Sequence, residues 1–449
     1  LVGYLFNQRK LLQTHIEGVL MQMVDNYPSL KQSNTANLLA WIVCFSAALF
    51  FFYEFIQGNM FASIAYNIMQ DFHIDAKKMA YLSSIYYVSN VIFLVFAGII
   101  LDTFSTKKTI LWAMSLCILS TFALAFTHSF YLALLCRFSA GIGSAFCFLG
   151  PVRLAARWFP PKRMAMITGI IVTIAMTGGM LAQYPLTCLV AQVGWRNALM
   201  QIGWLGLIIL GVMYCGIIDK PVKNSLQFTQ FLAFKTFKKV YLNLQIIRAA
   251  AFTSLMNMGI AVFGAMMGSL YLMERLSIAK EQAALINSML FLGAILGGPI
   301  IGWCSDKLNQ RVLLMKIGAI AALMVIVGIL FLPVSVNGMK SLFFLLGFFT
   351  AAQVISYALV AETNPAAVTA AAVSVVSILT QGGYIAYQNL FSLLLTYHHT
   401  IKYTAHVPYT LADYHYASFI LPLGLGLALC LIWRLPEMSK STKEAIAHD

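Results

Sequence analysis

The chain has 449 residues, of which 60% are hydrophobic and only 10% are charged, and its mean hydropathy is +0.81. A water-soluble domain carries about 25% charged residues on its surface, so this composition excludes a soluble fold. The net charge of +14 comes from small basic groups at the ends of apolar segments. It therefore reflects membrane topology rather than nucleic-acid binding. All eight cysteines lie in apolar segments and indicate no disulfide framework.

Residues 1–37 precede the first long apolar segment. Apolar residues between Leu12 and Met23 recur at helical spacing, opposite a polar face that begins with Arg9. The pattern predicts a short amphipathic helix in the cytoplasmic interface. A poorly ordered tail is the alternative, because chain termini are commonly loose. The segment lacks the cleavage site and the unbroken apolar core of a signal peptide.

Apolar segments of about 20 residues, the length needed to cross roughly 30 Å of hydrocarbon as a helix, recur along the rest of the chain. The alternating ten-residue segments typical of membrane barrels are absent from the sequence, so we expect an all-α integral membrane protein. Twelve spans are predicted, near residues 38–66, 79–101, 108–127, 130–157, 163–191, 196–218, 246–272, 280–303, 311–333, 338–361, 366–397 and 411–434.

The distribution of basic residues orients these spans. The two terminal segments and the even-numbered connections hold 20 of the 29 Lys and Arg residues, whereas the odd-numbered connections hold seven. Because basic residues accumulate in cytoplasmic loops, both termini are expected in the cytoplasm, in a multi-pass protein of the cell inner membrane. The expected divisions are an N-terminal cytoplasmic segment (1–37), two six-helix halves (38–218 and 246–434), a cytoplasmic linker (219–245) and a cytoplasmic tail (435–449).

The two halves are related by an internal repeat at an offset of 204 residues. Because the offset spans an even number of helices, the halves have the same orientation, with an axis along the membrane normal and a cavity between them. The coinciding pairs are Ile74 with Ile278, Ala80 with Ala284, Ser84 with Ser288, Gly98 with Gly302, Asp102 with Asp306, and Lys107 with Arg311.

The last three pairs form one pattern in each half: a glycine, an aspartate four residues later, and a base five residues further on. This pattern resembles the loop motif of the major facilitator superfamily, whose charges are thought to hold the two halves together. In the first copy Thr103 and Ser105 replace a base and a glycine that are usual there, so a thinner charge network is expected. The six residues, called the loop latch below, are Gly98, Asp102, Lys107, Gly302, Asp306 and Arg311.

A second motif lies in the fourth predicted span. Arg137-Phe-Ser-Ala-Gly141-Ile-Gly143 resembles the Arg-x-x-x-Gly-x-Gly motif of the same superfamily. The resemblance covers essentially all of residues 38–434, and it implies a secondary transporter that works by alternating access between two parallel-repeat halves. The sequence contains no ATP-binding loop or metalloprotease motif, so neither an enzyme nor a cofactor is expected.

Glu54 and Arg137 are charges deep within predicted spans. Glu54 lies 16 residues beyond Leu38, about 24 Å along the first span, and Arg137 lies at a similar depth on the fourth. An unpaired charge in hydrocarbon is costly, so we expect the two to pair across the cavity and to couple transport to protons. A purely structural ion pair is the alternative.

Arg153 follows Arg137 by 16 residues, a rotation of about 160° on an ideal helix. Both face the cavity only if Gly150-Pro151 bends the span. A structural base that extends to the membrane surface is the alternative.

Further polar residues are spread through the spans, and the densest group lies around Gln381 and Tyr384, where Gly382 and Gly383 are expected to bend span 11. We predict substrate contacts from Arg137, Arg153, Gln381, Tyr384, Tyr387, Tyr53 and Gln57. Other polar residues within spans are Asn59, Asn67, Asn90, Gln183, Tyr184, Asn257, Asn287, Gln353, Tyr357 and Asn389.

Four histidines gather near the last external loop, and only Asp413 lies close to them in the sequence. Solvated loop histidines are therefore expected rather than metal ligands. The histidines are His398, His399, His406 and His415.

These features predict a monomeric, proton-coupled symporter of a small carboxylate-bearing solute: an amino acid, short peptide, organic acid or carboxylate siderophore. The expected partners are this anionic or zwitterionic solute, protons and the lipid bilayer, without nucleic acid. Trp158-Phe-Pro-Pro-Lys-Arg163 and Gly194-Trp195-Arg196 resemble segments of superfamily branches that transport organic anions, and of bacterial branches near lysosomal dipeptide carriers. A proton-coupled exporter of drugs or metabolites and a non-transporting solute sensor are the alternatives.

Overall fold

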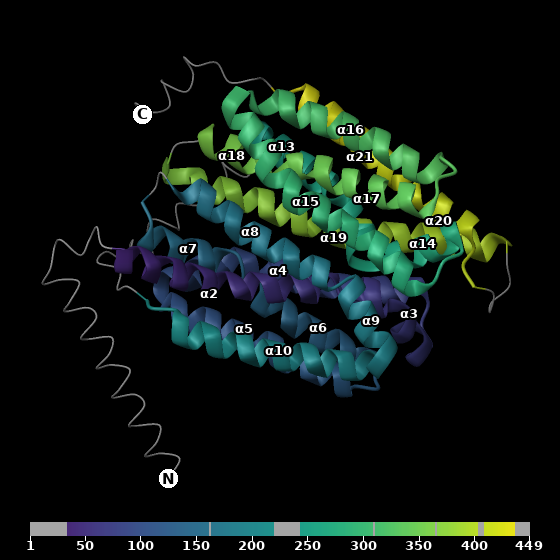
Figure 1. The fold of residues 1–449 in the computed structure, drawn as a ribbon, viewed down its shortest axis with the longest axis horizontal. Coiled ribbons are helices and arrows are strands. Elements are labelled where there is room, and N and C mark those ends of the chain that lie inside the picture. The colour runs from purple at the N-terminus through teal and green to yellow at the C-terminus, as the bar shows by residue number, and fades with distance from the viewer. Residues whose placement is uncertain are drawn as a thin grey trace, which may run out of the picture.

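The computed structural model describes residues 34–160, 163–219, 243–308, 310–363, 366–402 and 408–435. Within these ranges all regular secondary structure is helical. The helices run side by side along one axis (Figure 1). Helices satisfy every backbone N–H and C=O internally, as a bilayer requires. Most of the predicted N-terminal segment, the linker and the tail lies outside the described residues.

The N-terminal half contains six helical spans, three of which are built from two helices each. Polar N-cap residues explain several helix starts. At the start of α4, for example, the side chain of Asp75 accepts a hydrogen bond from Lys78 N (2.8 Å). The helices are α2 (Asn34–Asn59), α3 (Phe61–Asp71), α4 (Ala76–Thr103), α5 (Thr106–Phe126), α6 (Phe130–Ser144), α7 (Leu149–Trp158), α8 (Met164–Leu181), α9 (Tyr184–Val193) and α10 (Trp195–Gly216).

The C-terminal half has the same general plan, with short π and 3₁₀ segments inside two of its spans. Its elements are α13 (Leu244–Met256), the π-helix η3 (Ile260–Met267), α14 (Gly268–Leu276), α15 (Lys280–Leu308), α16 (Arg311–Phe331), α17 (Val336–Thr350), the 3₁₀-helix η4 (Ala351–Val354), α18 (Ile355–Glu362), α19 (Ala366–Lys402), α20 (Leu411–Ser418) and α21 (Ile420–Trp433).

Eleven helices in the described ranges are long and apolar enough to cross a membrane. The remaining predicted span corresponds to α19, a continuous helix of 37 residues, which is about 56 Å long. It carries more polar groups near its middle, including Gln381 and Gln388, and it lies among the other helices (Figure 1). The predicted all-α membrane fold is therefore confirmed.

The internal repeat is visible in the helix boundaries. α4 begins at Ala76 and α15 at Lys280, 204 residues later, and spans 4 and 10 are both interrupted, at residues 145–148 and 351–354. α4 packs against α19 and α8 against α15, so corresponding pairs of spans join the two halves. The described chain begins and ends at the same end of the bundle (Figure 1).

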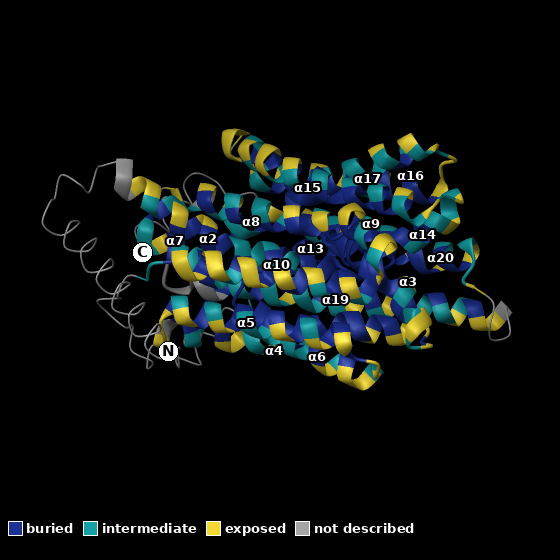
Figure 2. Cartoon of the chain, turned by 60° about the horizontal axis from the view of Figure 1, so that its bottom comes forward, coloured by how far each residue is buried: buried dark blue, intermediate teal, exposed yellow. Residues whose placement is uncertain are grey.

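The outside of the bundle is apolar. Large side chains such as Leu119, Trp204 and Leu423 are exposed on its surface. Figure 2 shows exposed residues on the outer faces of the helices and buried residues between them. This is the arrangement expected of helices whose outer faces contact lipid rather than water.

Two predicted bends differ from the structure. In span 4 the helix breaks at residues 145–148, before Pro151, which lies in the first turn of α7 where proline's missing N–H costs little. In span 11, α19 continues unbroken through Gly382 and Gly383. A Cβ on Gly383 would lie 2.1 Å from Ser254 Oγ, so this glycine allows α19 to approach α13 closely instead of bending the helix.

Candidate functional site

Arg137 is buried in the N-terminal half, with 1% of its surface exposed. The Cζ atom of its guanidinium lies over the rings of Phe61 and Tyr86, 4.6 and 4.5 Å from their centroids. Its Nη1 donates to the carbonyl oxygen of Gln57 (3.1 Å). Its Nε and Nη2 have no hydrogen-bond partner among the described residues. One edge of the guanidinium is therefore left without a hydrogen-bond acceptor by the residues that the structure describes.

Gly141 of the span 4 motif explains why Arg137 lies so close to Tyr86. A Cβ at Gly141 would lie 2.1 Å from the backbone oxygen of Tyr86 and 1.9 Å from Ser89 Oγ. Only glycine allows this distance between α6 and α4. Gly141 thus allows α6 to lie close to α4, and this close approach places Arg137 against the ring of Tyr86.

Glu54 on α2 is also buried, with 2% of its surface exposed. The hydroxyl of Tyr86 donates to Glu54 Oε2 (2.7 Å), whereas Oε1 has no partner among the described residues. Tyr86 therefore contacts both charges. The predicted direct ion pair between Glu54 and Arg137 is not among the described ion pairs, because Nη1 of Arg137 is directed to the backbone of α2 and Tyr86 stands as the bridge.

Tyr53 and Gln57 do not face the other half of the molecule. The Tyr53 hydroxyl lies 3.2 Å from Thr121 Oγ1, and Gln57 Nε2 donates to the same oxygen (2.7 Å). Both side chains thus bind α2 to α5 inside the N-terminal half. In this conformation their polar side-chain groups are occupied within the bundle, and the predicted substrate contacts of these two residues stay a prediction.

The predicted polar group of span 11 lies at the interface between the halves. The ring of Tyr384 packs on that of Tyr87, with centroids 4.7 Å apart. The hydroxyl of Tyr387 is hydrogen-bonded to Ser254 Oγ (2.9 Å), and Gln381 is half-buried. Arg153 lies on α7, beyond the break in span 4, and is half-buried. None of the described contacts of Arg137 involves Arg153.

The second copy of the loop latch forms a charge network. Arg311, at the start of α16, makes an ion pair with Asp306 and a second one with Glu362 of α18, whose Oε1 lies 2.7 Å from its Nη2. The arginine therefore joins the ends of three helices. A Cβ on Gly302 would meet nothing within 4 Å, so no close contact with a neighbouring helix requires this glycine in the described structure.

The first copy is built differently. Gly98 and Asp102 lie within α4, but the side chain of Asp102 lies outside the described part of the structure. Asp219, after α10, makes an ion pair with Arg157 and accepts a hydrogen bond from the backbone N–H of Lys107 (3.3 Å). The sequence motif thus missed the carboxylates contributed by neighbouring spans, Asp219 here and Glu362 in the second half.

A family model described as Major Facilitator Superfamily matches residues 43–259 and 249–448. The chain belongs to the Major Facilitator Superfamily. This membership agrees with the apolar helices of the structure, eleven of which are long enough to cross a membrane in the described ranges. The match extends over both halves of the bundle, in agreement with the internal repeat.

Among curated superfamily proteins, the chain is 28% identical over 194 residues to monocarboxylate transporter 14 of Homo sapiens, covering 41% of this chain and 35% of that protein. It is 27% identical over 193 residues to the probable galactarate/D-glucarate transporter GudP of Escherichia coli, covering 41% and 42%. The chain thus spans less than half the length of either relative. A solved bacterial homologue of the human lysosomal transporter Spinster, inward-facing and unoccupied, shares the fold with a TM-score of 0.69 at 14% identity over 91% of this chain and 98% of that one.

The histidines of this superfamily member differ from the prediction. His398 and His399 belong to α19, and their Nδ1 atoms lie 2.6 and 2.9 Å from the two oxygens of the buried Asp413. They are therefore part of a packed cluster instead of a solvated loop. Groups of three or more ligating side chains that could hold a metal do not occur in the described ranges, and His406 lies outside them.

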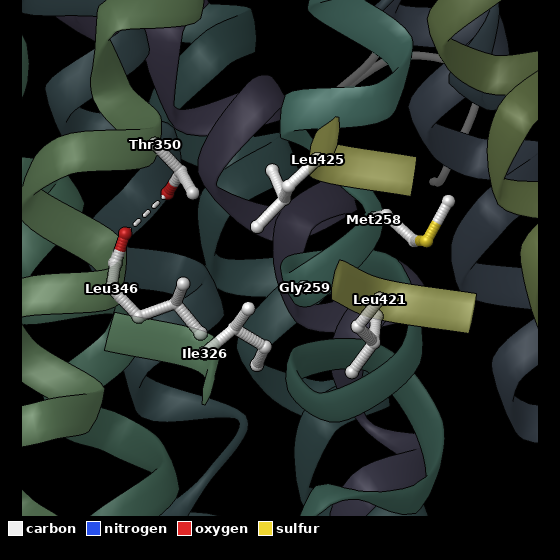
Figure 3. A pocket seen from close by; sticks show the side chains of 7 residues that line it. All are labelled: Met258, Gly259, Ile326, Leu346, Thr350, Leu421 and Leu425. Carbon is white, nitrogen blue, oxygen red and sulfur yellow. Dashed lines mark hydrogen bonds between the residues drawn. The ribbon is translucent and has the colours of Figure 1, made fainter. Parts of the chain in front are cut away.

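A narrow apolar gap lies within the C-terminal half (Figure 3). The only polar side chain on its wall is that of Thr350, which donates to the carbonyl oxygen of Leu346 (2.7 Å). Its walls offer no charged group that could bind an anion or carry a proton. None of the predicted site residues lines it. Its lining residues are Met258, Gly259, Ile326, Leu346, Thr350, Leu421 and Leu425.

Proposed function

We propose that this protein is a proton-coupled secondary transporter of small organic acids, in which Arg137 binds the substrate carboxylate and Glu54 carries the coupled proton. The observation that carries the proposal is the buried guanidinium of Arg137, whose Nε and Nη2 have no partner among the described residues. A buried donor without a partner is costly, so its presence beside a buried carboxyl group points to a ligand.

The chemistry of the unpaired edge favours a carboxylate. The N–H groups on Nε and Nη2 of an arginine point in parallel and match the two oxygens of a carboxylate. Nη1, on the opposite side, is already occupied by the carbonyl oxygen of Gln57. The Cζ of Arg137 also lies over the rings of Phe61 and Tyr86, so the edge that carries Nε and Nη2 is the part of the guanidinium left for a polar ligand.

Charge balance supports coupling to a proton. An empty site that holds Arg137 and an ionised Glu54 has no net charge. A bound carboxylate would leave one excess negative charge in a buried environment, which is unfavourable unless a proton accompanies it. Glu54 can accept that proton, because its Oε1 has no hydrogen-bond partner in the described part of the chain and its Oε2 accepts from the hydroxyl of Tyr86. One proton per carboxylate is therefore the expected stoichiometry.

The names of the relatives agree with this substrate class, since they describe transporters of monocarboxylates and of sugar acids. Their matched regions cover only part of each protein, so the similarity supports organic acids as a class and no individual acid. The polar side chains of span 11, including Gln381 and Tyr387, are proposed to bind the remainder of the solute when the two halves close around it.

Ligand-dependent thermal stability of the purified protein tests the binding step, with lactate, glucuronate, glucarate and glycylglycine as probes and lactamide and glucuronamide as uncharged controls. At least one acid should raise the unfolding temperature, because a ligand that binds only the folded protein stabilises it. Its amide should not. Arg137→Gln should abolish the effect. Arg196→Gln is the control, since Arg196 lies at the start of α10 and makes an ion pair with Asp71, and this variant should retain the effect.

Uptake into proteoliposomes then tests transport. Accumulation of the stabilising acid should require a pH gradient that is acidic on the side from which the acid enters. Binding without uptake would instead identify a solute sensor. Stabilisation by cations or neutral solutes, retained in Arg137→Gln, would contradict the proposed site.

A further inference from the structure

The end of α2 forms a hydrogen-bonding centre that connects Arg137 to the rest of the molecule. α2 ends at Asn59, in the outer part of the first span, and α3 begins at Phe61. The last carbonyl groups of a helix have no partner within it. Three consecutive ones here accept side-chain donors: the oxygen of Gln57 from Arg137 Nη1 (3.1 Å), that of Gly58 from the Tyr87 hydroxyl (2.9 Å), and that of Asn59 from Gln183 Nε2 (3.5 Å).

Gln183 in turn binds the C-terminal half. It lies at the break between α8 and α9, and none of its surface is exposed. Its Nε2 donates to the carbonyl oxygen of Gly264 (2.9 Å), and its Oε1 accepts from Asn287 Nδ2 (2.7 Å). Asn287 also donates to the carbonyl oxygen of Phe263 (2.9 Å) and is equally buried. The two amides therefore join spans 5, 7 and 8 across the interface.

The local backbone explains how these carbonyl groups become available. Phe263 and Gly264 belong to the π-helix η3, and π-helical turns within α-helices are frequent at functional sites. Gly264 also faces the ring of Phe291, 3.0 Å from where a Cβ would lie, so a side chain at this position would disturb the contact. The π-helix thus supplies two backbone acceptors to the amide side chains within an otherwise apolar interface.

Two of the three donors to the end of α2 therefore also contact the opposite half: Gln183 through Asn287, and Tyr87 through Tyr384. The third is Arg137. We propose that Gln183 and Asn287 form an inter-half lock, and that the end of α2 couples this lock to the occupancy of Arg137. The coupling rests on the proposed function, whereas the lock itself does not.

The coupling follows from neighbouring acceptors, because the three donors bind consecutive carbonyl groups at the end of α2. A carboxylate that binds the edge of Arg137 draws the guanidinium away from Gln57, and the released end of α2 can move. The contact between Asn59 O and Gln183 Nε2 is the longest of the three at 3.5 Å, and Gly179 O, at 3.4 Å, competes for the same amide hydrogens, so this contact is the first to be lost. Because coupling between two sites is reciprocal, opening the lock also changes the affinity of Arg137 for the anion.

Hydrogen–deuterium exchange of the full-length protein in nanodiscs, without any solute, tests the lock. Asn287→Leu removes both donor bonds while keeping a side chain of similar size. We expect at least tenfold faster exchange in peptides from α9 and α14, which lie at the end of the bundle opposite the start of α2 and the end of α21 (Figure 1). Gln183→Met, a second variant of similar shape, should produce the same change if the pair acts together.

Asn90→Leu is the matched control. Asn90 is also buried, at 4% exposure, and donates to Ser144 Oγ (2.6 Å), but both residues belong to the N-terminal half. It should not accelerate exchange in α14. Equal acceleration by Asn90→Leu, or none in either lock variant, would refute the lock. Additive effects of Asn287→Leu and Gln183→Met in the double variant would also refute it, because partners of one bond must be non-additive.

The coupling has its own readout. Arg137→Gln should accelerate exchange in α9 without solute, because it removes the bond to Gln57. Unchanged exchange would refute the coupling. If exchange is faster in the lock variants but no organic acid raises the unfolding temperature, the lock is supported and the proposed function is refuted. If an acid raises the unfolding temperature but exchange in the lock variants is unchanged, the proposed function is supported and the lock is refuted.

Discussion

Tyr86 contributes to the site in two ways, through its ring and its hydroxyl. The ring covers one face of the Arg137 guanidinium, and the hydroxyl donates to Glu54 Oε2. A single side chain therefore responds to the charge of both groups. This shared contact makes the roles of binding and proton transfer separable by substitution.

Arg137→Lys should weaken binding of the organic acid by at least about tenfold, which corresponds to about 1.4 kcal/mol. Lysine keeps the positive charge but has no planar edge for two parallel hydrogen bonds. Isothermal titration with the acid identified by the stability screen measures the effect. Affinity equal to that of the wild type would show that charge alone is recognised.

Glu54→Gln should abolish accumulation driven by a pH gradient while leaving exchange of labelled for unlabelled acid across the membrane. The amide keeps the size of the side chain but cannot take up a proton. Parallel uptake and counterflow measurements in proteoliposomes distinguish the two activities. Equal loss of both would indicate a structural role for Glu54.

Tyr86→Phe should keep the ring on Arg137 and remove the hydrogen bond to Glu54. We expect a displaced pH profile of uptake with less than about threefold change in affinity for the acid at saturating proton concentration. Uptake measured between pH 5 and 8 tests this, because only a residue that acts on the proton site would move the profile.

At the scale of helices, glycines decide how closely spans approach. Gly141 faces the backbone of α4, whereas Gly382 on α19 has nothing within 4 Å of a potential Cβ. The two positions look alike in the sequence, since each belongs to a glycine pair within an apolar span. Their different surroundings predict opposite responses to the same substitution.

Gly141→Ala should destabilise the protein by about 1–3 kcal/mol, because a methyl group cannot fit 2.1 Å from a backbone oxygen without separating α6 from α4. Gly382→Ala should instead be neutral or stabilising by up to about 1 kcal/mol, since alanine is the better helix former. Unfolding in detergent at rising temperature compares them directly. A larger loss for Gly382→Ala would contradict the packing of α19.

At the scale of the whole molecule, the two halves repeat their architecture but not their charge networks. Arg311 joins Asp306 and Glu362 in the second half, whereas Asp219 joins Arg157 and the start of α5 in the first. The side chain of Asp306 is 67% exposed and that of Glu362 33%. Water therefore screens the first ion pair more than the second.

Glu362→Gln should slow turnover more than Asp306→Asn does. Both should change equilibrium binding of the acid less than about twofold, because the described contacts of Arg137 involve neither carboxylate nor Arg311. Initial rates of exchange and binding constants for each variant check this. Normal turnover in both variants would exclude a role for the second copy of the latch in the transport cycle.

The sequence by itself determined the membrane class, the approximate positions of the spans, the repeat, and which helices carry Glu54 and Arg137. These properties depend on local composition, since about 20 apolar residues suffice to cross a bilayer. The corresponding starts of α4 and α15 follow from the same local patterns.

Only the tertiary structure decided which side chains meet. Whether Arg137 faces Glu54 or Gln57, and whether Tyr53 faces a cavity or α5, depends on the rotation of each helix and on partners 60 to 80 residues away. The pairing of Gln183 with Asn287 spans 104 residues and requires a break in one span and a π-helix in another. Apolar helix faces of similar composition allow many rotations, and close packing between spans selects one of them.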